Sequence, residues 1–159
     1  MPLNFYRFDV NWIVPWPKRP VFEALTALER FPLWWPDYRV VNRFGDESFE
    51  MTLRSTLPYS LVVTHTFTVR DAQDGHFRLA LDGDIRGWID FVVADREGGV
   101  SAVQITQECT AVKPLLRALA PVAKPAFRHN HALTMRHGRA GLEKLLGLQQ
   151  LPGAGEGAR

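Results

Sequence analysis

The sequence is poor in the features that mark secreted, membrane-spanning and metal-binding proteins. Its 159 residues include one cysteine, Cys109, so no disulfide can form within the chain and a thiolate zinc site is not expected. It contains no run of about 18 apolar residues, so no transmembrane helix is expected. The first ten residues lack the basic start and apolar segment of a secretory signal peptide. These absences favour a cytoplasmic location.

Motifs of several enzyme and cofactor classes are also missing. The chain has no H-E-x-x-H, no G-x-S-x-G, no phosphate loop and no dinucleotide fingerprint. His129 and His131 are close in sequence, but on a helix they point about 200° apart and cannot share a cation. The basic residues lack the interleaved aromatics typical of single-strand nucleic-acid binding. We therefore expect no metal, no cofactor and no nucleic-acid partner.

The composition is that of an ordinary globular domain, with 46% hydrophobic and 23% charged residues. We expect one domain over residues 1–149 and a flexible, glycine-rich tail over residues 150–159. The net charge of +2 is unevenly placed, because residues 111–159 hold 8 Lys and Arg against 2 Asp and Glu. This segment is either a basic helix docked on a mildly acidic sheet or a face for an acidic partner, such as a carrier protein.

Alternation of apolar and polar residues predicts a sheet. Residues 5–14 and most of residues 48–112 have the period of two that indicates half-buried strands. Turn signals such as Asp74-Gly75 and Gly98-Gly99 separate neighbouring strands by hairpin lengths, so the sheet is expected to be antiparallel. The side chains expected on the inward face include Trp12, Met51, His65, Phe67, Val69, Leu79, Phe91, Gln107 and Cys109.

Helical spacing predicts two main helices. Val21, Leu25 and Leu28 indicate the first, and a stripe that includes Phe127, His131 and Met135 indicates a long helix from Pro125 to about Leu148. Prolines limit residues 113–125 to a short helix and a connector. One face of the sheet must be covered, and only the long helix is large enough. We expect an α+β fold in which a curved antiparallel sheet grips this C-terminal helix.

Four segments of the sequence resemble the START/Bet v 1-like (SRPBCC) superfamily, and within it the polyketide cyclase/dehydrase-like group. They read PVFEALTALERFPLWWPDY, LPYSL, DGDIRGWIDF and KPLLRALAPVAKPAFRHNHALTMRHGRAGLEKLL. The resemblance implies a helix-grip fold with a deep apolar cavity between the sheet and the long helix. It also implies binding of a hydrophobic molecule, such as a lipid or an aromatic compound. It does not specify the ligand or the oligomeric state, because the superfamily hosts several functions.

Two adjacent tryptophans, Trp34 and Trp35, stand between Pro32 and Pro36. They either line the mouth of the implied cavity or cap the core as an aromatic cluster. With this pair, the candidate cavity residues are Trp12, Trp34, Trp35, Met51, His65, Phe67, Leu79, Phe91, Gln107, Cys109, Phe127, His131 and Met135. Cys109 fits a small buried hydrophobe better than a nucleophile.

The histidines decide between two function classes. His65 and His131 fall on otherwise apolar faces, where each is either a core residue with a hydrogen-bond partner or a polar group that meets a ligand. A carrier of a hydrophobic or aromatic molecule needs only an apolar cavity. A polyketide cyclase or dehydratase needs a general acid or base, and the candidates are His65, His131 and Tyr59. We favour the binding protein.

Overall fold

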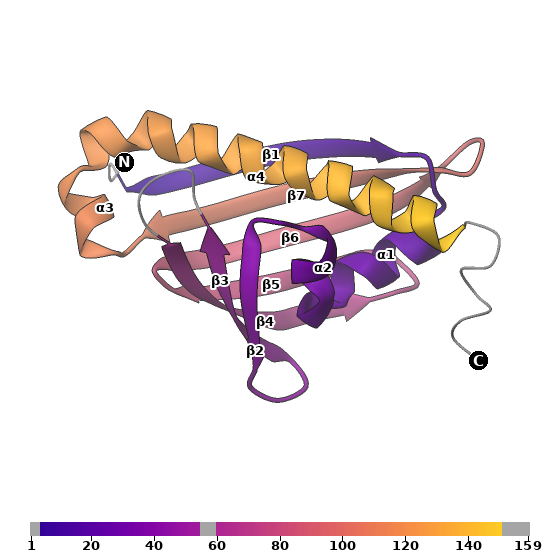
Figure 1. Ribbon diagram of the computed structural model, residues 1–159, viewed down its shortest axis with the longest axis horizontal. Helices are drawn as coiled ribbons and strands as arrows, with labels where there is room; N and C mark the ends of the chain where they lie inside the picture. The colour runs from indigo at the N-terminus through magenta and orange to yellow at the C-terminus, as the bar shows by residue number, and fades with distance from the viewer. Residues whose placement is uncertain (1–3, 55–59, 151–159) are drawn as a thin grey trace.

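The computed structural model describes residues 4–54 and 60–150. Its strands form one seven-stranded antiparallel sheet in the order β1-β7-β6-β5-β4-β3-β2. The strands are β1 (Phe5–Val14), β2 (Tyr38–Arg43), β3 (Ser48–Arg54), β4 (Ser60–Asp71), β5 (His76–Gly83), β6 (Ile85–Arg96) and β7 (Val100–Ala111). The sheet curls, and the long helix α4 (Ala120–Gln149) runs lengthwise across its concave side (Figure 1). The predicted α+β helix-grip fold is confirmed.

The remaining helices are short. The segment between β1 and β2 holds α1 (Lys18–Thr26), a 3-10 turn (Leu28–Arg30) and α2 (Phe31–Trp34), and α3 (Pro114–Ala118) precedes α4. In α1 the predicted apolar positions Val21 and Leu25 are fully buried, and Pro20 sits in the first turn, where its missing N–H costs no helix bond. Figure 1 shows α1 and α2 near the C-terminal end of α4 and α3 near its other end.

Helix α4 begins five residues before the predicted start at Pro125. Proline removes one hydrogen-bond donor and crowds the preceding turn, so the pattern favours a break there. In the structure Pro121 occupies the first turn, and Pro125 lies inside the helix. Pro125 is the sixth residue of α4, so the bond that it cannot make is the one to the backbone oxygen of Pro121 in the first turn.

Two features of the sheet differ from the sequence prediction. Strand β2 was not predicted, because the register shifts between Tyr38 and Val40 and the shift breaks the apolar alternation. Val69 was expected to face inward with Phe67, but it is 37% exposed. The pairing of β4 with β5 shifts between these two residues, and the extra residue turns Val69 outward.

Candidate ligand cavity

A small cavity lies between the concave face of the sheet and α4. It encloses about 60 Å³. Five of its lining residues come from α4 at helical spacing, and the others come from strands β2 to β7. The lining residues are Tyr38, Leu53, Leu61, Val63, His65, Leu81, Ile85, Ile89, Gln107, Phe127, Asn130, His131, Thr134 and Met135. No Lys, Arg, Asp or Glu is among them, so the described wall carries no formal charge while its histidines are neutral.

His65 projects from β4 into this wall and is 5% exposed. Its Nδ1 lies 3.1 Å from the backbone oxygen of Val63. A carbonyl oxygen only accepts, so Nδ1 carries the proton and donates. Burial lowers the pKa of His65 to about 4, and the bond to Val63 offsets only part of this effect. The ring is therefore neutral near pH 7.

His131 projects from α4 and meets the sheet through Gln107 of β7. Its Nε2 donates to the Oε1 atom of Gln107 at 3.1 Å, and the amide nitrogen of Gln107 donates to the Cys109 sulfur at 3.5 Å. The imidazole also stacks on the Phe8 ring, with 3.6 Å between centroids. Burial lowers the pKa of His131 to about 4. The two predicted histidines thus enter one cavity from opposite walls, both neutral.

Tyr38, Asn130 and Thr134 are polar cavity residues that sequence reasoning missed. Tyr38 packs edge-on against His65, with ring centroids 6.2 Å apart, and burial raises the pKa of its phenol well above the usual value. It was missed because β2 was not predicted. Asn130 and Thr134 could have been found, since each lies three residues after a predicted position, Phe127 and His131 respectively, on one helix face.

The structure separates the predicted cavity residues into three groups. His65, Gln107, Phe127, His131 and Met135 line the cavity. A second group is buried in the hydrophobic core without contributing to the described lining: Trp12, Trp35, Met51, Phe67, Leu79, Phe91 and Cys109. Trp34 is also buried in the core, and it lines a groove on the outer surface. Tyr59 and the tail from residue 151 onward lie outside the described residues.

Trp34 and Trp35 belong to an aromatic cluster that holds the α2 segment against α4. Their rings stack with centroids 5.4 Å apart, and Trp35 also packs against Phe31 and Tyr38 at 5.3 and 5.0 Å. Trp35 lies between the core and the helix, where Gly138 leaves room for its indole. This arrangement corresponds to the second sequence alternative, a cluster that caps the core.

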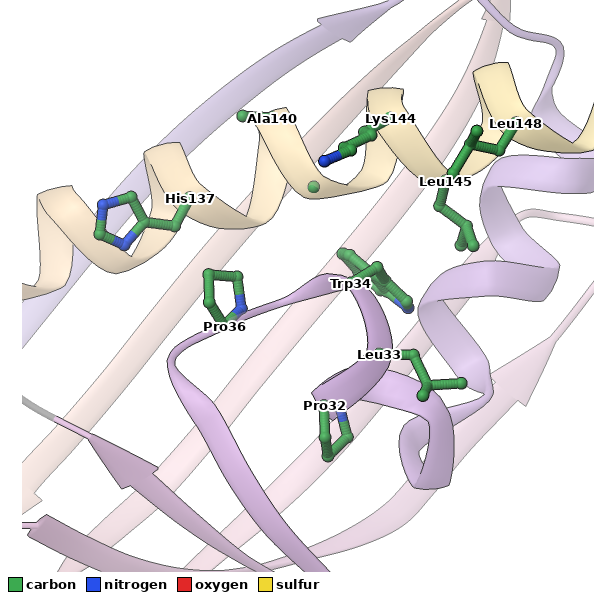
Figure 2. A pocket seen from close by; sticks show the side chains of 10 residues that line it. Pro32, Leu33, Trp34, Pro36, His137, Ala140, Lys144, Leu145 and Leu148 are labelled. Atoms are coloured by element: carbon green, nitrogen blue, oxygen red, sulfur yellow. The ribbon is translucent and has the colours of Figure 1, made fainter.

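The outer groove lies between the α2 segment and the C-terminal half of α4. It has a volume of about 440 Å³ and is largely apolar, with Lys144 and His137 on the helix side. Figure 2 shows Trp34 lying between α4 and the turn at Leu33, with Leu145 pointing from the helix toward it. At one end of the groove, His137 Nδ1 donates to the Asp37 carboxylate at 2.9 Å.

Residues 4–54 and 60–150 contain neither a cluster of metal-binding side chains nor a membrane-spanning helix. Within these ranges no three His, Cys, Asp or Glu side chains come together in a way that could hold a metal ion. No helix in the same part of the chain is long and apolar enough to cross a membrane.

Comparison with known proteins shows the fold. No protein-family model and no curated protein sequence matches the chain. Solved structures do match. The Zhui aromatase/cyclase from Streptomyces sp. R1128 superposes with a TM-score of 0.78 at 8% identity, over 91% of this chain and 95% of that one. The chain has the START/Bet v 1-like fold.

Two more solved structures share this fold with the chain. A START superfamily protein from Mycobacterium smegmatis matches with a TM-score of 0.73 at 12% identity, over 91% of this chain and 99% of that one. Ara h 8.0201 matches with a TM-score of 0.66 at 12% identity, over 90% and 99%. The suspected resemblance is therefore confirmed at the level of the fold. Identities this low carry no information about the ligand.

Proposed function

We propose that this protein binds a neutral hydrophobic or aromatic small molecule in the cavity between the sheet and α4. The observation that carries the proposal is the chemistry of the wall. Its described residues are mostly apolar, they include no formally charged side chain, and they bring a few neutral polar groups together. Ligand sites of this kind combine an apolar lining with a small number of placed polar groups that fix orientation.

The size of the cavity limits what enters without rearrangement. Its volume of about 60 Å³ is well below the roughly 300–1,000 Å³ of typical ligand pockets. A ligand larger than a few heavy atoms therefore requires lining side chains to move. Met135 is the best placed to do so, because an unbranched thioether side chain adopts many shapes at little cost.

The alternative function is a polyketide cyclase or dehydratase, for which His65 and His131 would supply the acid and base. The match to an aromatase/cyclase structure supports it at the level of the fold. The electrostatics disfavour it, because burial lowers the pKa of both imidazoles to about 4. An efficient catalytic group has a pKa near the working pH, and neutral imidazoles of this kind are weak bases and are not acids. We therefore favour binding over catalysis.

An acidic carrier protein is the macromolecular partner that we propose for this chain. The exposed side of α4 presents Arg128, Arg136 and Arg139, with Glu143 paired to the last of these at 3.4 Å. A basic surface of this kind attracts an acidic partner.

Native mass spectrometry of the purified protein tests the binding proposal. We expect a small molecule to be retained under gentle ionisation and released on unfolding. Ile89→Phe adds volume inside the cavity and should abolish retention. Val92→Phe is the matched control on the same strand, because Val92 faces outward and is 36% exposed. Equal retention by the two variants would place the ligand elsewhere. A folded wild type that retains nothing and takes up no apolar probe would refute the proposal.

A further inference from the structure

His65 leaves one hydrogen-bond acceptor unfilled in the cavity wall. Its Nδ1–H is committed to the backbone oxygen of Val63, so in the neutral ring Nε2 carries a lone pair and no proton. Within the described residues Nε2 has no hydrogen-bond partner, although the side chain is 95% buried and lines the cavity. His65 lines the cavity, so a donor for this lone pair must come from what occupies the cavity.

Three polar residues of the cavity wall direct their hydrogens elsewhere. His131 donates to Gln107, and the Gln107 amide is directed to Cys109. The Thr134 hydroxyl donates to the Asp37 carboxylate at 3.0 Å. The Tyr38 hydroxyl has no partner within the described residues, and it can donate or accept. The sheet side of the wall therefore offers the Nε2 lone pair of His65 and, in edge contact with that ring, the adaptable hydroxyl of Tyr38. The helix side holds a second acceptor, because Nε2 of the neutral His131 ring donates to Gln107 and Nδ1 carries the lone pair.

We infer that the ligand of this cavity is a neutral apolar molecule with a hydroxyl or N–H group, such as a phenol or an alcohol, and that this group donates its hydrogen to His65 Nε2. The inference rests on the proposed function, because it specifies the ligand of the same cavity. A hydroxyl fits best, since its hydrogen can be donated to His65 Nε2 while its oxygen accepts a hydrogen bond from the Tyr38 hydroxyl. An ether or a ketone offers no hydrogen to Nε2. A carboxylate would place its negative charge beside the lone pair of His65 Nε2. This is unfavourable, because the described residues of the wall include no cation to pair with it.

The low pKa of His65, about 4, supports the same assignment. A protonated ring would present Nε2–H as a donor and would select carbonyls or anions instead. Because the ring is neutral above pH 5, the preference for donors should persist across the physiological range.

Matched probes of similar shape test the inference. We would titrate the full-length protein, labelled with ¹⁵N, with phenol, anisole and benzoate, and follow binding by NMR. Phenol should bind more tightly than anisole by about tenfold, which is the order of effect expected when a buried acceptor is left unpaired. Benzoate should bind most weakly. The ¹⁵N resonance of His65 Nε2 should move on binding of phenol and stay in place with anisole.

Variants separate the role of His65 from general packing. His65→Phe keeps an aromatic ring at this position and removes the Nε2 acceptor. The variant should therefore bind anisole and lose the preference for phenol. His129→Phe is the control, because His129 is exposed on α4 and lies outside the cavity lining. This variant should keep the wild-type preference. If His65→Phe does not fold, the probe series and the Nε2 resonance in wild type decide the question.

The outcomes distinguish a failure of the donor requirement from a failure of the proposed binding function. Equal affinities for phenol and anisole at the cavity would overturn the donor requirement and leave the proposed function standing. A preference that persists in a folded His65→Phe would assign the donor contact to another atom and also overturn the inference. Absence of binding by all three probes at the cavity would overturn both.

Discussion

The indole N–H of Trp35 donates a 2.8 Å hydrogen bond to the backbone oxygen of Thr134, in a buried position between the α2 segment and α4. The contact requires two glycines on the helix. A Cβ atom on Gly138 would lie 2.4 Å from the Trp35 ring, and one on Gly141 would lie 1.8 Å from the backbone oxygen of Trp34. The tryptophan pair therefore clamps the helix, and the close approach depends on the missing side chains.

Alanine substitutions in α4 should separate this packing effect from helix propensity. Gly138→Ala and Gly141→Ala should each lower the free energy of unfolding by about 1–3 kcal/mol, because the added methyl overpacks the contact. Gly141→Ala should cost more, since it meets backbone. Gly147→Ala is the control, as its nearest neighbour would be 3.9 Å away; it should raise stability by about 0.5–1 kcal/mol. Chemical denaturation measures all three, and stabilisation by Gly138→Ala would refute the clamp.

Asp37 should contribute more to stability than an exposed aspartate. Its side chain is 12% exposed and accepts from His137 and the Thr134 hydroxyl. Asp37→Ala leaves the buried Thr134 hydroxyl without its acceptor, so the free energy of unfolding should fall by about 1–3 kcal/mol. The control is Asp46→Ala, because Asp46 is 93% exposed in its pair with Arg43 and such pairs contribute roughly 0–1 kcal/mol. Equal losses in the two variants would show that Asp37 is not a structural acceptor.

Stability should fall on acidification because His65 is buried as a neutral ring. Its folded pKa of about 4 lies below the unfolded value of 6.5, so the unfolded chain takes up the proton first. The contribution is fully present above pH 6.5 and is lost as the pH falls toward 4. Between pH 7 and pH 4.5 this amounts to about 2–3 kcal/mol. Urea denaturation of wild type and His65→Phe measures it: the variant should show a shallower pH dependence, and parallel curves would contradict the assignment.

Cys109 should be unreactive in the native protein. It is 1% exposed, and burial raises the pKa of its thiol to about 12, although the hydrogen bond from Gln107 opposes part of this effect. Only the thiolate reacts with disulfide reagents. Labelling with Ellman's reagent should therefore be negligible until denaturant unfolds the chain, and then reach one thiol per molecule. Rapid labelling of the folded protein would show that the site is accessible.

The sequence predicted the features that depend on local periodicity. The strand at residues 5–14, the inward placement of His65 and Gln107, and the helical stripe through His131 all follow from spacings of two, three or four residues. These spacings place His65 on the inward face of the sheet and His131 on the inward face of the long helix, so both could be predicted to enter the same interior. Strand β2 and the orientation of Val69 could not be predicted, because a shift in register depends on the partner strand and leaves little trace in the sequence of the strand itself.

The placement of Trp34 and Trp35 could not be predicted from local periodicity. The proline-flanked sequence of this pair is compatible with two placements, at the mouth of a cavity or as a cluster that caps the core. The choice is made by Gly138 and Gly141, about 100 residues later in the chain, where small residues permit the close approach. Tyr38 was missed for a related reason, since its contact with the cavity depends on strand pairing at the edge of the sheet.

The clamp also bears on the order in which the chain folds. Trp35 and Thr134 are 99 residues apart in the sequence, whereas β3 to β7 pair with their neighbours through short hairpins. Closing so long a loop costs more entropy than closing a hairpin, and contacts of high sequence separation slow folding. The hairpins of β3 to β7 should therefore assemble first. Helix α4 should dock late, and so should β1, in which Phe5 pairs with the distant Thr110 of β7. Substitutions at the clamp should then act mainly by accelerating unfolding, with little change in the folding rate.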